Sequence, residues 1–151
     1  EQHRVALGAI LAWRRNRPGH YSQLLDAVER DPDHLALNGA VAFAAIEQED
    51  WDTAATHSLS VIARRPSLGV MQSVRGLALA RSGRMDEAKD PLNRSTKNDI
   101  GRPVLMRVAA SAYSKAGQAD RARSLLEEAH ELDPKDTRIQ RALFALPIKK
   151  K

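Results

Sequence analysis

Cysteine is absent from the 151 residues of this chain. Disulfides, thiol catalysis and cysteine-ligated zinc are therefore excluded, because each of them needs a cysteine sulfur. A cysteine-free chain suits the cytoplasm and the bacterial periplasm equally well. The chain opens on Glu1 rather than Met, which is typical of a trimmed or processed form, so its localisation stays open between these two compartments.

Long apolar runs are also absent. No segment approaches the roughly 18 consecutive apolar residues that a membrane-spanning helix needs. The first residues do not show a basic segment followed by an apolar one, which is the pattern of a secretory signal peptide. We therefore expect no direct membrane span in these 151 residues.

An excess of charge of one sign is missing from most of the chain. The windows 1–34, 35–68, 69–102 and 103–136 carry net charges of 0, −2, +3 and −1, so they sum to zero and the excess of +5 lies in residues 137–151. Binding along a nucleic acid needs an extended basic face that follows the phosphates. No nucleic-acid partner is therefore expected.

Patterns that carry catalysis or bind metals are missing as well. The five histidines, at positions 3, 20, 34, 57 and 130, show neither an i,i+4 pair nor a His-Glu-x-x-His motif, and no glycine-rich loop could hold a phosphate. Acidic residues cluster at positions 127, 128 and 131, but Arg121 and Arg123 lie nearby on the same expected helix. This favours a solvated, ion-paired face over a catalytic carboxylate pair. We expect a non-catalytic protein with no metal and no cofactor.

An internal repeat organises what the chain does contain. Proline recurs with a period of 34 residues: Pro66 lies one period after Pro32, and Pro134 lies two periods after Pro66. The position between the last two holds Ile100. Four further columns collect mostly small or turn-forming residues. They are Gly8, Ala42, Gly76 and Ala110; His20, Ala54, Ala88 and Ala122; Ala27, Val61, Ser95 and Ala129; and Arg15, Glu49, Gly83 and Gly117. A period in this range predicts a stacked array of similar units.

Each unit is predicted to be a pair of helices. In the last repeat, apolar residues recur at helical spacing at positions 122, 125, 126 and 129. Gly117, before them, can take the left-handed conformation that ends a helix. Pro134, after them, cannot continue a helix interior. Small side chains at Ala110 and Ala122 let the two helices approach closely, so the unit is a helical hairpin.

These features resemble the tetratricopeptide repeat. The fourth window matches best, with Tyr113 in its first helix, Gly117 in its turn and the ending "ELDP"; the second keeps "EDWDTAA" and the third "RGLALARSGRMDEA", while the first departs at "NRPGHY". The resemblance implies an all-α fold, a right-handed α-solenoid of antiparallel helical hairpins. We expect one domain over residues 1–146, with repeats at 1–34, 35–68, 69–102 and 103–136.

The end of the chain carries a further helical pattern. Apolar residues at positions 139, 142, 143 and 146 recur at helical spacing until Pro147. They predict a capping helix over residues 137–146 that covers the apolar face of the last hairpin. Residues 147–151 form a basic tail, for which a solvated end is favoured over a lipid or nucleic-acid contact.

Function in arrays of this family usually lies in the groove that the first helices of successive hairpins line. The resemblance therefore implies a partner-binding face that is apolar over three hairpins and basic toward the fourth. Its candidate residues are Trp13, Phe43, Ile46, Val70, Val74, Leu77, Arg81, Arg107 and Lys115. Some family members use residues on this face to bind the terminal carboxylate of a partner peptide. The matching positions here hold Val5, Ala9, Ala40, Val70 and Val74, so this carboxylate-binding clamp is absent.

Two functional hypotheses follow. The first is a non-catalytic adaptor or scaffold that holds an amphipathic or hydrophobic protein segment in the groove, with Arg81, Arg107 and Lys115 selecting an acidic flank. The second is an oligomerisation or spacer module of a larger protein, in which a second copy fills the groove. Repeats like these serve bacterial assembly, secretion and export systems, and the Ala- and Arg-rich composition suits a bacterial source.

Overall fold

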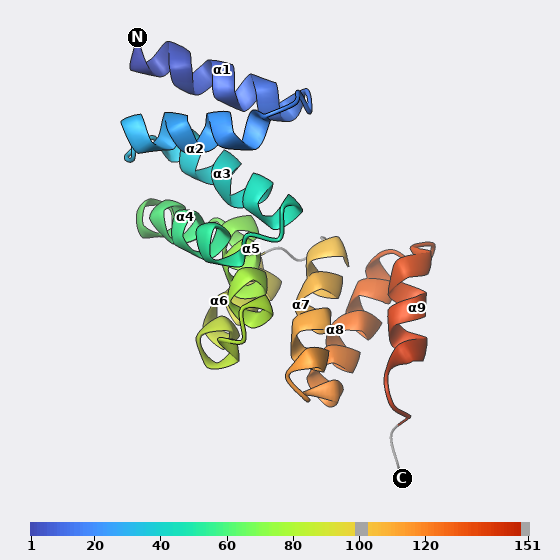
Figure 1. The fold of residues 1–151 in the computed structure, drawn as a ribbon. Helices are drawn as coiled ribbons and strands as arrows, with labels where there is room; N and C mark the ends of the chain where they lie inside the picture. The colour runs from blue at the N-terminus through green and yellow to red at the C-terminus, as the bar shows by residue number, and fades with distance from the viewer. Residues whose placement is uncertain (99–102, 149–151) are drawn as a thin grey trace.

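The structure, a computed structural model, describes residues 1–98 and 103–148. Within these residues there are nine helices and no strand, which confirms the all-α solenoid (Figure 1). The helices are α1 (Gln2–Arg14), α2 (His20–Arg30), α3 (Leu35–Glu47), α4 (Trp51–Arg64), α5 (Gly69–Arg81), α6 (Met85–Asn98), α7 (Pro103–Lys115), α8 (Ala119–Leu132) and α9 (Thr137–Ala145). Ile100 and residues 149–151 lie outside the described part of the chain.

Three-residue turns join the helices of the second, third and fourth pairs. Glu49, Gly83 and Gly117 take left-handed conformations there, with φ of 58°, 81° and 76°. The amide that follows each of them donates back into the last turn of the preceding helix, as Arg84 N does to Leu79 O at 2.8 Å. This is the hydrogen bond with which a glycine-type helix end satisfies its carbonyls. The turns therefore form where the glycine column predicts them.

The first pair has a longer turn. Asn16 (φ 49°) and Gly19 (φ 72°) are left-handed there, so the left-handed residue next to α1 is Asn16 and not Arg15 of the predicted column. Helix α2 has 11 residues, whereas α4 and α8 have 14. Its last residue, Arg30, nevertheless precedes Arg64, the last residue of α4, by one full period of the repeat. The "NRPGHY" sequence thus shortens α2 at its start and leaves the register of its end unchanged.

Small residues bring the helices of a pair into contact. Ala54, Ala88 and Ala122 are completely buried. A Cβ atom added to Gly76 would lie 2.6 Å from Cγ and Cδ2 of Leu92, which is closer than real Cβ contacts come. The close approach of α5 and α6 therefore requires glycine at position 76.

The loops between pairs share a side-chain hydrogen bond. In three of them, an amide side chain six residues after the loop proline donates to the carbonyl oxygen of that proline. The pairs are Asn38 and Pro32 at 2.8 Å, Gln72 and Pro66 at 3.2 Å, and Gln140 and Pro134 at 2.8 Å. The corresponding slots of the remaining repeat hold Ile100 and Met106, so proline and amide are lost together there.

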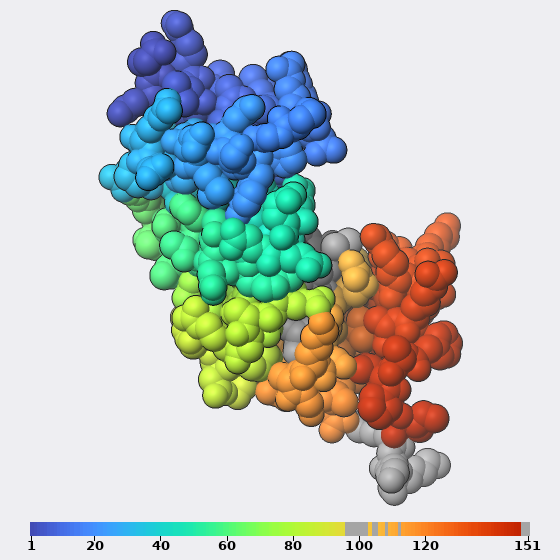
Figure 2. Space-filling model, in the orientation of Figure 1, coloured from blue at the N-terminus to red at the C-terminus, as the bar shows by residue number. Residues whose placement is uncertain are grey.

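The stack is elongated, with α1 at one end and α9 at the other (Figures 1 and 2). Buried side chains run along it: one cluster joins α1, α2 and α3, a second joins α3, α4 and α5, and a third continues to α9. Ile139 of α9 is completely buried, whereas Phe144 of the same helix is 89 % exposed. Helix α9 thus buries the face that carries Ile139 and exposes the face that carries Phe144.

Candidate functional site: an apolar groove across α1, α3 and α5

A groove of about 630 Å³ crosses the first helices of the first three pairs. Its lining residues are almost all apolar. They are Ile10, Trp13, His34, Leu35, Ala36, Gly39, Ala40, Phe43, Val61, Leu68, Val70 and Met71. The volume is typical of a ligand-binding cleft. Helix α1 contributes side chains from its last turns and α5 from its first turn, and the residues of α3 join these two parts of the apolar surface.

Trp13 and Phe43 form the aromatic part of the groove. Their rings lie nearly parallel, with centroids 6.2 Å apart and an interplanar angle of 12°. The indole Nε1 of Trp13 donates to Glu47 Oε2 at 3.2 Å, which fixes the orientation of the indole. Both aromatic residues are half-buried, so part of each ring faces solvent. Partly exposed, preordered aromatic rings are the side chains that most often anchor a protein partner.

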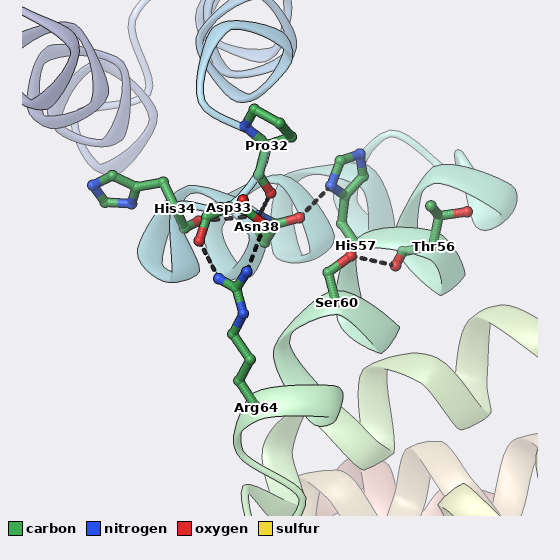
Figure 3. A network of polar contacts seen from close by, with 8 residues as sticks. All are labelled: Pro32, Asp33, His34, Asn38, Thr56, His57, Ser60 and Arg64. Atoms are coloured by element: carbon green, nitrogen blue, oxygen red, sulfur yellow. Dashed lines mark hydrogen bonds and ion pairs between the residues drawn. The ribbon is translucent and has the colours of Figure 1, made fainter.

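A polar network supports the loop that brings His34 to the groove (Figure 3). Asn38 is 3 % exposed, and its Nδ2 donates to the carbonyl oxygens of Pro32 and His34 at 2.8 and 3.0 Å. Both of its amide protons are used in this way, so Oδ1 accepts from Nδ1 of His57 at 2.8 Å. Burial lowers the pKa of His57, although the charge of Asp50 opposes this. The neutral imidazole therefore remains the form that supports the loop at neutral pH.

His34 and Arg64 complete the attachment of this loop. Nδ1 of His34 accepts from the backbone N–H of Leu37 at 3.2 Å and thereby caps α3. The ring of His34 also stacks on His3 of α1, with centroids 5.9 Å apart. Arg64 of α4 forms an ion pair with Asp33 at 2.5 Å and also donates to its carbonyl oxygen. The loop is thus held by α1, α3 and α4 together, which defines one border of the groove.

The structure distributes the predicted site residues over several environments. Trp13, Phe43 and Val70 line the groove together. Val74 is only 6 % exposed and packs in the core beneath it, where half-buried Ile46 also makes contact. Leu77 is half-buried as well.

The three predicted basic residues do not border this groove. The guanidinium of Arg81 lies 5.9 Å from the ring centroid of Trp51, in a cation–π contact. Arg107 and Lys115 line a separate cavity of about 260 Å³ between α7, α8 and α9, together with Ser111 and Ser114. Nε of Arg107 is buried there and has no hydrogen-bond partner among the described residues.

Some lining residues were not predicted. Leu68 and His34 precede α5 and α3 and share a column of the repeat, so they lie outside the first helices, to which the predicted face was confined. Ile10, Leu35, Gly39 and Met71 were also missed because they lie one position away from the face assigned to the groove. The side chain of Leu68 is 42 % exposed, and this exposure indicates that the apolar surface extends from the helices into the loops.

Two other kinds of site do not occur among the described residues. No group of three or more His, Cys, Asp or Glu side chains is placed to hold a metal ion in the described part of the chain. Over the same residues, no helix combines the length and apolar character needed to cross a membrane.

Comparison with known families identifies the array. The profile of the family described as Psidin, N-terminal TPR repeats region, matches residues 41–151. The chain belongs to the tetratricopeptide repeat family. This confirms the resemblance seen in the sequence and places the chain among repeat arrays that act as scaffolds for protein–protein interaction. No curated protein sequence matches the chain.

Solved structures of other tetratricopeptide repeat proteins share the fold. MamA from Desulfovibrio magneticus RS-1, from residue 41 to its end, gives a TM-score of 0.78 at 16% identity, over 94% of this chain and 81% of that one. MamA MSR-1 C2 gives 0.76 at 19% identity, over 91% and 79%. The first TPR of Spaghetti (RPAP3), bound to an HSP90 peptide, gives 0.65 at 15% identity, over 73% and 87%. At these identities the likeness shows the fold.

Proposed function

We propose that this chain is a non-catalytic adaptor that holds an amphipathic or hydrophobic segment of a partner protein in the groove across α1, α3 and α5. The observation that carries the proposal is the stacked pair Trp13 and Phe43, half-exposed on an otherwise apolar surface. Val70 extends that surface onto α5. The RPAP3 domain, which has the same fold, binds a peptide of HSP90, and this supports a groove-binding role.

The size of the groove is consistent with modest, reversible binding. Burying about 500 Å² of apolar surface contributes roughly 12 kcal/mol gross at ~25 cal/mol/Å², while association costs about 4–15 kcal/mol. Micromolar affinity is therefore expected. An amphipathic helix suits the groove because its apolar stripe presents side chains at every turn to a surface that is itself built from helical turns.

The basic residues beyond the groove suggest the chemistry of the flanking part of the partner. Arg81 is exposed, and Arg107 and Lys115 lie farther along the array in the cavity beside α9. We propose that a partner segment with its apolar stripe on Trp13 and Phe43 carries acidic residues toward these cations. Ile46, Val74 and Leu77 then shape the surface between the two regions from within the array.

A matched pair of glycines provides the test. Gly39 lies in the groove and Gly8 lies outside it, and a Cβ atom at either position would meet nothing within 4 Å. Both are in helices, so Gly39→Gln and Gly8→Gln should each stabilise the fold slightly. We expect Gly39→Gln and Phe43→Ala to weaken binding of a fluorescent amphipathic peptide with an acidic flank by about tenfold or more, and Gly8→Gln to leave it unchanged. Unchanged affinity in both groove variants would overturn the proposal.

A second candidate function is self-association at the first helix. Leu7 and Leu11 of α1 are 52 % and 39 % exposed, whereas Val41 and Ala45, one period later, are completely buried. The face of α1 that is open corresponds to a face of α3 that is buried, and a second copy could cover it. Light scattering over a dilution series separates this spacer role from the adaptor role: a stable dimer that Leu7→Ser with Leu11→Ser abolishes would favour the spacer.

We also propose that the adaptor belongs to a bacterial assembly, secretion or export system. The fold shared with MamA of Desulfovibrio magneticus supports this placement at the level of fold alone. Co-purification of the chain with its partner from the source cells tests it.

A further inference from the structure

A cavity of about 260 Å³ lies between α7, α8 and α9, which pack together at the C-terminal end of the array (Figure 1). Its polar lining comes from one face of α7, because residues three or four positions apart in a helix lie one above the other. The polar residues are Arg107, Ser111, Ser114 and Lys115, and the apolar ones are Ala110, Leu126, Ala142, Ala145 and Leu146. None of these residues lines the apolar groove, so the two sites are separate.

The two cations of this cavity have no counter-ion in the described part of the chain. Arg107 is half-buried, and its Nε is buried without a hydrogen-bond partner among the described residues. No acidic residue lines the cavity, and neither Arg107 nor Lys115 forms an ion pair with another described residue. A partly buried charge that is left unpaired is unfavourable, because it loses hydration without compensation. The cavity is therefore suited to an anion from outside the chain.

This set of polar residues is particular to the fourth repeat. The corresponding positions of the first repeat hold apolar residues, which are Val5, Ala9, Ala12 and Trp13. The column of Ser111 holds Phe43 in the second repeat and Leu77 in the third. All four positions are polar together only in the fourth repeat. Because the same helix face packs with apolar residues elsewhere in the array, the fold itself does not require two cations and two hydroxyls there.

The size and charge of the cavity favour one class of anion. Its volume lies below the roughly 300–1,000 Å³ of sites for drug-sized ligands, which favours a small group over a nucleotide. A phosphate monoester carries a charge of about −1.5 to −2 at pH 7 and offers three acceptor oxygens. A carboxylate carries a single charge and offers two oxygens. Two cations and two hydroxyl donors therefore match a phosphate monoester better than a carboxylate.

We propose that the cavity between α7, α8 and α9 binds a phosphate monoester on a short carbon chain. The guanidinium of Arg107 and the ammonium of Lys115 bind the phosphate oxygens, and the hydroxyls of Ser111 and Ser114 donate to the same group. The carbon chain lies on the apolar side chains of α8 and α9. The phosphate belongs either to a small free molecule or to a phosphorylated side chain of a partner protein, and the experiment below separates these two sources.

This site deepens the proposed function and rests on it in one respect. The proposed function assigns an acidic flank of the partner to Arg107 and Lys115, and the phosphate monoester is here named as the acidic group. Binding of the phosphate does not require an occupied groove, because the two sites share no residue. The two proposals can therefore fail separately.

Isothermal titration calorimetry of the 151-residue chain tests the site. The probe is the N-acetyl methylamide of phosphoserine, and the controls are the same derivatives of serine and glutamate. We expect the phosphoserine derivative to bind, the glutamate derivative to bind at least about tenfold more weakly, and the serine derivative not to bind. Added salt should weaken the binding, because both cations are only partly shielded from solvent.

Substitutions in α7 should act on this binding in a defined order. Arg107→Gln is expected to weaken it by about tenfold or more, and Lys115→Gln by about threefold, because Lys115 is exposed. Ser111→Glu places a carboxylate four residues from both cations, so it should raise the thermal midpoint while it abolishes binding of the probe. A variant that is more stable yet does not bind cannot be explained by misfolding.

Matched controls separate this site from the groove. Arg4→Gln removes an exposed cation on α1 and should leave binding of the phosphoserine derivative unchanged. Phe43→Ala should also leave it unchanged, although it weakens binding of the amphipathic peptide. The source of the phosphate follows from that peptide with one phosphoserine in its acidic flank. Binding about tenfold tighter than that of the free derivative would assign the site to a phosphorylated partner, and equal binding would assign it to a small free phosphate monoester.

Three results would overturn the proposal. The first is the absence of binding by the phosphoserine derivative and by the phosphorylated peptide. The second is equal binding of the phosphoserine and glutamate derivatives, which would assign the cavity to carboxylates. The third is unchanged binding in both Arg107→Gln and Ser111→Glu, which would place the phosphate elsewhere on the molecule.

Discussion

Gly76 and Gly8 occupy the same column of the repeat but meet opposite surroundings. Gly76 faces Leu92 at a distance that excludes a Cβ atom, whereas Gly8 is exposed on α1 with nothing near it. The same substitution should therefore have opposite signs at the two positions. Gly76→Ala should destabilise the protein by about 1–3 kcal/mol through overpacking, and Gly8→Ala should stabilise it by about 0.5–1 kcal/mol through helix propensity.

Urea unfolding monitored by circular dichroism measures both changes. The pair serves as its own control, because backbone entropy is lost equally at the two sites. A stabilising Gly76→Ala would mean that α5 and α6 can move apart at no cost, and the close packing inferred from this column would then be wrong.

A second pair of residues, Tyr21 and Asp50, joins α2 to the start of α4 through a hydrogen bond from the tyrosine hydroxyl to Oδ2, at 2.7 Å. Burial, and then the bond and charge of Asp50, raise the pKa of Tyr21 to about 12. Burial by itself would raise the pKa of Asp50, but the hydrogen bonds from Tyr21 and Thr53 lower it overall. The bond therefore needs a protonated tyrosine and an ionised aspartate.

Removing this hydroxyl should give a pH-dependent loss. Tyr21→Phe is expected to cost about 1 kcal/mol at neutral pH. The raised pKa of Tyr21 means that its contribution is complete below pH 10.0, its ordinary value, and is lost as the pH rises to about 12. The lowered pKa of Asp50 means that its contribution is lost as the pH falls through the folded value. Unfolding free energies of both proteins over this range check the prediction, which a constant difference would contradict.

The hydrogen bonds that hold the loops between helical pairs are also expected to differ in strength with their surroundings. In three of the loops, an amide side chain of the following helix donates to the carbonyl oxygen of the loop proline. The three amides differ in burial. Asn38 is 3 % exposed and Gln72 is 4 % exposed, whereas Gln140 is half-buried. Asn38 also accepts a hydrogen bond from His57, so its replacement should lower the stability most.

Substitution of each of the three amides should lower the free energy of unfolding, most at Asn38 and least at Gln140. Asn38→Leu is expected to cost about 2–3 kcal/mol because it leaves several partners unsatisfied, Gln72→Met about 1 kcal/mol, and Gln140→Met less than about 0.5 kcal/mol. Methionine is the appropriate replacement because the chain itself has Met106 in this column. Midpoints of urea unfolding give the order. Equal losses at all three positions would show that burial does not control the strength of this bond.

The array as a whole is expected to open from its first pair. A solenoid is stabilised by contacts between neighbouring pairs, and in these 151 residues the first pair has a neighbour on one side. Here α2 is also short, with 11 residues, and Leu7 and Leu11 of α1 face solvent. We predict that amides in α1 and α2 exchange with solvent by sub-global opening, while those in α3 and α5 exchange only on global unfolding.

Hydrogen exchange followed by mass spectrometry tests this order. Gly8→Ala should raise the protection of α1 and leave that of α5 unchanged, because it acts on α1 alone. Uniform protection from α1 to α9 would contradict the prediction and would show that the array unfolds as one cooperative unit.

Much of the fold is predictable from the sequence because the constraints that build it are local or periodic. Glycine in the turn, alanine at the helix contact and proline after the second helix each act within one pair, and the repeat brings them back in the next. The nature of the groove could also be predicted in part, since Trp13 and Phe43 belong to first helices. The limits of the groove could not, because His34 and Leu68 enter it from loops. The paths of these loops depend on the hydrogen bonds that Asn38 and Gln72 donate to the proline carbonyl oxygens.

The sequence by itself determines a stack of helical pairs, because the residues that bring two helices together contact residues of their own repeat. Packing between repeats, in contrast, decides which side chains remain exposed to solvent. Val74 follows the same helical pattern as Phe43 yet is buried in the array. Arg107 belongs to a different cavity, and Phe144 faces solvent in a column that is otherwise small. The reason is physical: the exposure of a side chain depends on whether an adjacent helical pair covers it, and that is set by packing between residues far apart in sequence.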